Sequence, residues 1–261
     1  MIFRILCLGD VVGRPGRDVM KKHLPALLKN EQVDFCIVNA ENAAGGSGII
    51  PEIFNELMSY GIQCVTTGDH IWKKKEIIPV IEKDQRLLRP ANYPLEAAGR
   101  GFAVYDTAKG IQVAVLNLQG RVFMKPIDCP FKTADDILEQ IPASVRIIIC
   151  DFHAEATSEK VAMGWYLDGR VSFVFGTHTH IQTADETILP QGTAYITDLG
   201  MTGPYESVIG RRVDKVLHTL ITSMPTTFDV AEGDVRISGA IAAIDAATGK
   251  AIEIKRIVVK N

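Results

Sequence analysis

The sequence of 261 residues predicts an α/β protein folded as a single domain over residues 1–261, with helices outside its β-structure. Apolar runs of strand length alternate with helical patterns through the first two thirds of the chain. Turn signals dominate after residue 190, and no repeat or Ser/Pro-rich linker interrupts the sequence. These observations leave two architectures open: one mixed sheet, or two mixed sheets packed face to face between helices.

The first part of the chain reads as three strand–helix pairs. The expected strands cover residues 5–8, 35–38 and 63–66, and the expected helices cover residues 17–29, 51–60 and 75–83. The first helix repeats apolar residues at helical spacing, as at Met20 and Leu24. The second has Pro51 in its first turn and Gly61 after its end, where these residues are favoured. This alternation indicates parallel strands covered by helices.

The later part mixes hairpins with further strand–helix units. The turn signal Lys109-Gly110 lies between two apolar runs, and Thr248-Gly249 lies between two more, so each set predicts a hairpin. The hairpin strands cover residues 101–106, 111–118, 237–244 and 251–259. Strands are also expected at 146–150 and 171–175, and helices at 133–140 and 158–167. A helical pattern begins at Arg211 and Arg212, which we expect on the surface.

Composition limits the classes of protein and partner. The chain has 28 Lys and Arg against 31 Asp and Glu, and 47% of its residues are hydrophobic. This excludes a disordered chain and an extensive nucleic-acid-binding surface, leaving a small nucleotide or an RNA end as partner. Five cysteines without a CxxC pair predict a reduced, cytoplasmic protein. No segment approaches the roughly 20 apolar residues of a membrane span. The sequence does not decide whether the protein forms a homo-oligomer.

Metal-ligand side chains cluster at the ends of the expected strands. They are Asp10, Glu41, Asn42, Asp69, His70, His153, His178 and His180. Taken singly, each has an ordinary structural explanation as a cap, a turn residue or a hydrogen-bonded histidine. In parallel α/β sheets, however, ligands bind beyond the carboxyl ends of the strands. Because these residues recur at equivalent places, we expect them to meet in space.

This donor set indicates two metal ions. Imidazoles and carboxylates without thiolates suit Mn, Fe, Zn or Co better than a thiolate zinc site. Seven or eight ligands exceed the needs of one ion but suit two divalent ions roughly 3.5–4 Å apart that share a carboxylate. Such a pair binds phosphate oxygens and activates water. The predicted reaction is therefore phosphoester hydrolysis by a metal-bound hydroxide.

Six sequence blocks resemble the YmdB-like bacterial metallophosphoesterases, of the calcineurin-like phosphoesterase superfamily. The blocks are GDVVG (9–13), NAENAAGG (39–46), TGDHIW (67–72), DFHAEATSEK (151–160), GTHTHIQTAD (176–185) and TDLGMTGP (197–204). The resemblance spans the whole chain. It implies two packed mixed β-sheets flanked by helices, and a phosphodiesterase that hydrolyses 2′,3′-cyclic nucleotides or related RNA-type phosphodiesters.

The resemblance also implies two metal positions that share one carboxylate. The first position would be formed by Asp10, Glu41 and His180. The second would be formed by the bridging Glu41 together with Asp69, His153 and His178. Asn42 would coordinate a metal or contact the substrate phosphate. His70 would lie near the leaving oxygen, as a general acid or as a donor to phosphate.

Two departures from the family pattern bear on activity. Val12 stands where the superfamily's D-x-H opening has histidine, and Asp69 stands where this family usually has asparagine. The extra negative charge should strengthen metal retention and weaken phosphate attraction. Two other functions stay open: a phosphomonoesterase, acting as a nucleotidase or protein phosphatase, and a metal-binding regulatory protein that acts through a partner surface.

Overall fold

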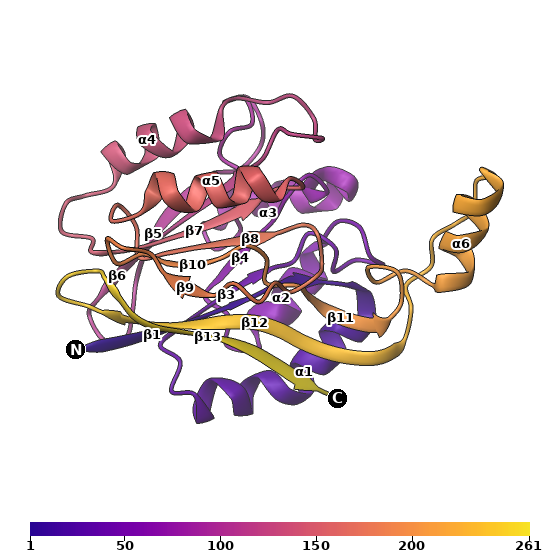
Figure 1. The fold of residues 1–261 in the computed structure, drawn as a ribbon, viewed down its shortest axis with the longest axis horizontal. Coiled ribbons are helices and arrows are strands. Elements are labelled where there is room, and N and C mark those ends of the chain that lie inside the picture. Colours follow the sequence, from indigo (N-terminus) through magenta and orange to yellow (C-terminus); the bar gives the residue numbers. More distant parts are fainter.

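A computed structural model, which describes residues 1–261, contains two β-sheets packed face to face between outer helices (Figure 1). The first sheet has the order β2-β11-β12-β1-β3-β4, with β13 paired to β12. Its strands are β1 (Ile2–Leu8), β2 (Asp10–Val11), β3 (Phe35–Asn39), β4 (Cys64–Thr66), β11 (Met201–Glu206), β12 (Gly233–Asp245) and β13 (Ala251–Lys260). Two packed sheets are therefore confirmed, and the single mixed sheet is excluded.

The second sheet has the order β5-β6-β7-β8-β10-β9. Its strands are β5 (Phe102–Asp106), β6 (Gln112–Gln119), β7 (Ile147–His153), β8 (Phe173–Thr177), β9 (Thr187–Ile188) and β10 (Ala194–Ile196). The central strands β6, β7, β8 and β10 are parallel, and β5 and β9 are antiparallel edges. Both predicted hairpins are present, as β5–β6 and β12–β13. The sequence did not indicate that β12 returns to pair with β1.

Six α-helices are present, and all but the last cover the outer faces of the two sheets. They are α1 (Gly13–Asn30), α2 (Pro51–Met58), α3 (Ile78–Lys83), α4 (Pro130–Gln140), α5 (Thr157–Leu167) and α6 (Val213–Thr222), with short 3-10 helices at Ile71–Lys73 and Lys75–Ile77. The expected helix at 75–83 therefore begins as a 3-10 turn and continues as α3. The other expected helices lie where the apolar spacing predicts them, with shifted ends.

Strand alternation divides the core into layers. In β1, Phe3 and Ile5 belong to the apolar cluster between the sheets, whereas Leu6 and Leu8 belong to the cluster under the outer helices. All four side chains are fully buried. Because successive side chains point to opposite faces, a central strand buried on both faces must be apolar throughout. This explains the unbroken apolar run at the start of the chain.

The same alternation carries polar residues into the space between the sheets. In β7, Ile147 and Ile149 lie in the apolar cluster between the sheets, and Cys150 lies in the cluster under the outer helices. Asp151 and His153 continue the face of Ile147 and Ile149, and both are fully buried. The apolar layer between the sheets therefore ends in polar side chains at the carboxyl end of β7.

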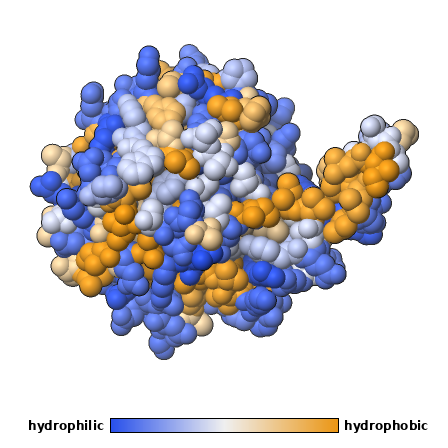
Figure 2. All heavy atoms as spheres, viewed as in Figure 1, coloured by the Kyte–Doolittle hydropathy of each residue, from blue (hydrophilic) through white to orange (hydrophobic).

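One segment projects away from the body, as Figure 1 shows for α6. No residue of α6 is buried, and Leu217, Leu220 and Ile221 are among its exposed apolar side chains (Figure 2). We call residues 207–231 the arm. Its helix matches the helical pattern that begins at Arg211 and Arg212.

The structure also bears on the predictions about membrane spans and cysteines. None of its helices combines the length and apolar character needed to cross a bilayer. The five cysteines are free thiols, and Cys7, Cys36, Cys64 and Cys150 are buried. Burial raises the pKa of the Cys36 thiol above its usual value, so this side chain behaves as a small apolar group.

Candidate metal centre

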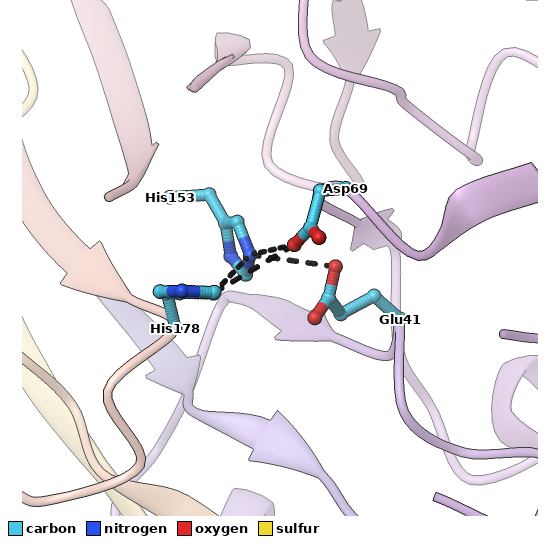
Figure 3. A group of neighbouring side chains, drawn as sticks. All are labelled: Glu41, Asp69, His153 and His178. Carbon is cyan, nitrogen blue, oxygen red and sulfur yellow. Dashed lines mark hydrogen bonds and ion pairs between the residues drawn. The ribbon is translucent and has the colours of Figure 1, made fainter. Parts of the chain in front are cut away.

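Four of the predicted ligands converge on one small volume (Figure 3). One ligand atom from each of Glu41, Asp69, His153 and His178 lies within 4.8 Å of all the others. His153 Nε2 is 3.0 Å from His178 Nδ1 and 3.4 Å from Asp69 Oδ1. The same nitrogen is 3.4 Å from Glu41 Oε2. We call this group the inner cluster.

Both sheets contribute to the inner cluster. Glu41 and Asp69 follow β3 and β4 of the first sheet, whereas His153 ends β7 and His178 follows β8 of the second. Gly68 permits the close approach, because a Cβ there would collide with the His153 ring and with the Glu41 carboxylate. The convergence agrees with the expectation that parallel strands present ligands at their carboxyl ends.

The loop after β8 has an unusual backbone. His178 and His180 have φ angles of 96° and 66°, in the region that residues other than glycine rarely adopt. Hydrogen bonds hold this conformation: the His178 amide donates to Asp10 Oδ2 at 3.1 Å, and the Thr179 hydroxyl donates to Asp198 Oδ2 at 2.7 Å. Such strain persists only where surrounding contacts enforce it, and it is often found at functional sites.

A second group, which we call the outer pair, consists of Asp10 and His180. Asp10 is fully buried, and its Oδ1 accepts no hydrogen bond although it lies 3.7 Å from His180 Nε2. His180 Nδ1 is 3.0 Å from the Ile209 carbonyl, which can only accept. Nδ1 therefore carries the proton, and Nε2 presents its lone pair. A cation between this nitrogen and the unpaired carboxylate oxygen would satisfy both, so these residues fit a metal ion.

Asn42 and His70 connect the two groups. The Asn42 amide donates to Glu41 Oε1 at 3.0 Å and lies 3.2 Å from His180 Nε2. His70 Nδ1 is 2.8 Å from Asn42 Oδ1 and 3.3 Å from Glu41 Oε1. Its Nε2 lies 3.7 Å from Asp69 Oδ2. The structure therefore brings all eight predicted site residues together.

The ionisation of these groups reflects their mutual charges. Burial alone would raise the pKa of Glu41, but the charges of His153 and His70 lower that pKa to about 2. Burial would lower the pKa of His153, but Glu41, Asp69 and Asp10 raise it to about 10. The hydrogen bond to Glu41 also raises the pKa of His70. These shifts therefore favour the protonated, positively charged forms of His153 and His70 when no metal is bound.

Burial is the main cause of the pKa shifts of three other groups in the centre. Burial, assisted by the neighbouring charge on His153, lowers the pKa of His178 to about 3. Burial raises the pKa of Asp10. Burial also raises the pKa of Asp151 to about 6, against the hydrogen bonds that this carboxylate accepts. His178 is therefore neutral at pH 7, as a metal ligand must be.

The centre opens into a cavity of about 350 Å³ that reaches the base of the arm. His70, Asn42 and Glu155 line it together with both loop histidines. Glu155 Oε2 lies 3.1 Å from His178 Nε2, so the other nitrogen of this ring faces the inner cluster. A larger hollow of about 590 Å³ lies between the arm and the body, but it contains none of the predicted ligands.

Arg211 corrects one expectation from the sequence. We expected it on the surface, but its guanidinium is half-buried and lines the cavity. It donates to the carbonyl oxygens of Gly45 at 3.3 Å and Phe228 at 2.9 Å, and also to Gly46. The arm is thereby tied to the loop after β3, because three carbonyl groups attract the charge inward. A sequence pattern of two adjacent arginines carries no signal for this contact.

Sequence reasoning also missed the residues that support the ligands. Asp151 stands two positions before His153 and Glu155 two positions after it, which is a strand-like spacing that could have marked them. Lys160 and Asp198 form a buried ion pair of 2.6 Å behind the histidine loop, from elements far apart in sequence. Only the fold brings such a pair together.

Known proteins are similar to this chain in both sequence and fold. The family model described as "YmdB-like protein" matches residues 6–257. The chain is 48% identical to a 2′,3′-cyclic-nucleotide 2′-phosphodiesterase of Bacillus subtilis, over 99% of this chain and 97% of that protein.

Two solved structures share the whole fold. A crystal structure of a hypothetical protein from Thermus thermophilus has a TM-score of 0.93 and 38% identity, covering 99% of this chain and 100% of that one. The crystal structure of a phosphatase from Mycoplasma pneumoniae has a TM-score of 0.94 and 34% identity, covering 100% of this chain and 94% of that one.

Proposed function

This chain belongs to the YmdB-like protein family, and we propose that it is a metal-dependent phosphodiesterase acting on 2′,3′-cyclic nucleotides or related RNA-type phosphodiesters. The observation that carries the proposal is the inner cluster, in which two imidazoles and two carboxylates meet within 4.8 Å. The relative from Bacillus subtilis supports the substrate class through its name and its 48% identity.

We assign two divalent ions to the centre, with Fe or Mn favoured and Zn, Co or Mg as alternatives. One ion would lie between Asp10, Glu41 and His180. The other would lie among Glu41, Asp69, His153 and His178. The orphaned Asp10 Oδ1 and the close approach of the His153 and His178 nitrogens support this division. Nitrogen and oxygen donors without thiolate suit these metals.

When bound, the ions neutralise phosphate charge and lower the pKa of water to give a nucleophile at neutral pH. The chain's own residues orient the reactants. Asn42 Oδ1 and Glu41 Oε1 hold His70 Nδ1, which leaves His70 Nε2 to carry a transferable proton. The contact with Glu41 raises the pKa of His70, so this ring is suited to protonate the leaving ribose oxygen.

The size of the cavity indicates a small substrate. Its volume of about 350 Å³ falls within the range of small-molecule sites. Glu155 lines it, as do Ile209 and Arg211 of the arm. A cyclic mononucleotide or the end of an RNA strand therefore suits the opening better than a long duplex.

The proposal extends to the setting of the enzyme. We place it in the cytoplasm as one phosphoesterase domain of residues 1–261. Its five free thiols support a reducing compartment. Because ligands come from both sheets, neither sheet alone would form the site.

A phosphomonoesterase is the second candidate, since the Mycoplasma pneumoniae structure is described as a phosphatase. Assays at equal metal loading separate the two functions. We expect turnover of 2′,3′-cyclic AMP with added Mn²⁺ to exceed that of 3′-AMP, and a His153→Ala variant to lose it. A preference for 3′-AMP would favour the phosphomonoesterase, and no metal-dependent turnover of either would contradict both.

A further inference from the structure

We propose that Asp151 is a positioning residue that orients two metal ligands through hydrogen bonds and is needed for tight metal binding; the inference rests on the metal centre proposed above. Asp151 is fully buried beneath the inner cluster and has no cation within ion-pairing distance. A buried carboxylate without a positive partner is costly unless it accepts several hydrogen bonds. Those hydrogen bonds show what it does.

Asp151 joins the two sheets under the site. Its Oδ1 accepts from the Thr177 hydroxyl of β8 at 2.7 Å. Its Oδ2 accepts from the Thr66 hydroxyl of β4 at 2.5 Å and from the Asn39 amide of β3 at 3.2 Å. The three donors stand at the last residues of their strands, each close to a predicted ligand. The carboxylate thus fixes side chains from both sheets.

The first connection runs through Thr177 to His153. Thr177 Oγ1 lies 2.9 Å from His153 Nδ1. The hydroxyl has one proton, and it is directed to the Asp151 carboxylate, so its oxygen can only accept from the imidazole. His153 must therefore carry a proton on Nδ1. Its Nε2 is left to face the inner cluster, where a metal needs a lone pair.

The second connection runs through Asn39 to Glu41. Because the Asn39 amide nitrogen faces Asp151, its carbonyl oxygen faces the other way and accepts from the Glu41 backbone amide at 3.2 Å. This contact holds the turn after β3 that carries the bridging carboxylate. Both sets of contacts depend on Asp151 being an acceptor at each oxygen.

An Asp151→Asn substitution keeps the shape and reverses one contact. If the new amide nitrogen faces Thr177, the threonine hydroxyl turns toward His153 Nδ1 and drives the imidazole proton to Nε2, where it blocks metal binding. If it faces Asn39 instead, two amide donors oppose each other and the turn with Glu41 loosens. In either orientation, one of the two ligands, His153 or Glu41, binds metal less well.

Zinc affinity measured by chelator competition tests the proposal without relying on turnover. Asp151→Asn and Thr177→Val should each weaken Zn²⁺ binding by about 10–100-fold. Thr177→Ser keeps the hydroxyl and should bind nearly as the wild type does. Asp168→Asn is the matched control, since Asp168 is also buried but accepts from the backbone amides of Gln191 and Thr193. It should leave zinc affinity unchanged.

A spectroscopic readout separates orientation from general destabilisation. Nitrogen-15 NMR of the zinc-loaded wild type should show a protected proton on His153 Nδ1, retained in Thr177→Ser and lost or rapidly exchanging in Thr177→Val. If Asp151→Asn does not fold, the comparison of Thr177→Ser with Thr177→Val still tests whether this hydrogen-bond chain orients His153. Equal zinc affinity in wild type and Thr177→Val would overturn the role of Asp151 alone. A wild type that binds no zinc would overturn it together with the proposed function.

Discussion

The inner cluster and the outer pair are built differently, although the proposed bridging carboxylate of Glu41 would serve both. In the inner cluster the ligand atoms are crowded, and His153 ends a central strand that is buried on both faces. In the outer pair, Asp10 Oδ1 lacks any donor, and His180 depends on the Ile209 carbonyl of the arm. One histidine of the inner cluster thus stands on a central strand, whereas the histidine of the outer pair is held by a carbonyl of the projecting arm. We therefore expect the inner position to hold its ion more tightly.

The largest effect is expected where the two positions meet. Glu41→Gln removes the shared negative charge, so the affinity for both ions should fall. Turnover should then decrease by more than about 100-fold, which exceeds the usual effect of losing a residue that only supports a ligand. Elemental analysis and kcat/KM would measure this. Glu159→Gln is a suitable control, because Glu159 is buried but bonds backbone amides at Arg121 and Val122. A Glu41→Gln protein with full metal content would show that Glu41 does not bridge.

The loop that carries one histidine of each group gives the next test. Lys160→Met leaves the buried Asp198 without its cation and should destabilise the fold by about 3–5 kcal/mol. Thermal unfolding of the metal-free protein measures the loss. Adding Asp198→Asn should recover part of it, because the uncompensated charge is gone. An unchanged unfolding temperature in Lys160→Met would mean that the pair does not support this loop.

Asp69→Asn should change the inner cluster more mildly. The substitution removes one negative charge but keeps an oxygen donor, so metal retention should weaken while phosphate attraction strengthens. We expect higher phosphodiesterase activity at saturating metal, or an altered metal preference. Activity titrations with Mn²⁺ and Zn²⁺ would reveal either change. If metal content and activity both stay the same, Asp69 is not a ligand.

The next prediction changes no side chain and concerns the protons that metal binding releases. The pKa of His153 is raised to about 10 by the surrounding carboxylates, against burial, so metal must displace a proton from it at pH 7. Affinity at the inner position should then rise by about tenfold per pH unit between pH 7 and 9. Calorimetric titration in buffers of different ionisation enthalpy would count the released proton. Affinity independent of pH would contradict this.

The same shift affects stability without metal. The folded-state pKa of His153 lies above its ordinary value of 6.5. Its charge interactions therefore stabilise the metal-free fold fully below about pH 6.5, and this stabilisation is lost as the pH rises toward 10. Urea unfolding of chelator-treated protein across this range should show the decline, and it should be reduced in His153→Ala.

The convergence of the candidate ligands was predictable from the sequence because strand ends are local features. His153 and Asp69 each follow an apolar run, so their common edge could be inferred before the fold was known. The pairing of β12 with β1 was not predictable, since it joins the two ends of the chain. The choice between one sheet and two therefore stayed open on residue patterns alone.

The supporting residues were harder to find for a physical reason. Asp151 and Thr177 lie within strands, and their function depends on contacts between strands rather than on spacing. Arg211 faces the cavity because carbonyl groups from two distant loops meet around it. Such interactions depend on register and loop closure, which a single sequence does not encode locally.

Anomalous X-ray diffraction from Mn²⁺-loaded crystals tests the two-position arrangement most directly. We expect two peaks bridged by Glu41, each within bonding distance of its oxygen and nitrogen ligands. One should be bound by Asp10 and His180, and the other by Asp69, His153 and His178, with the latter retaining higher occupancy when Mn²⁺ is limiting. A single peak at saturating Mn²⁺, or peaks away from these residues, would contradict the assignment.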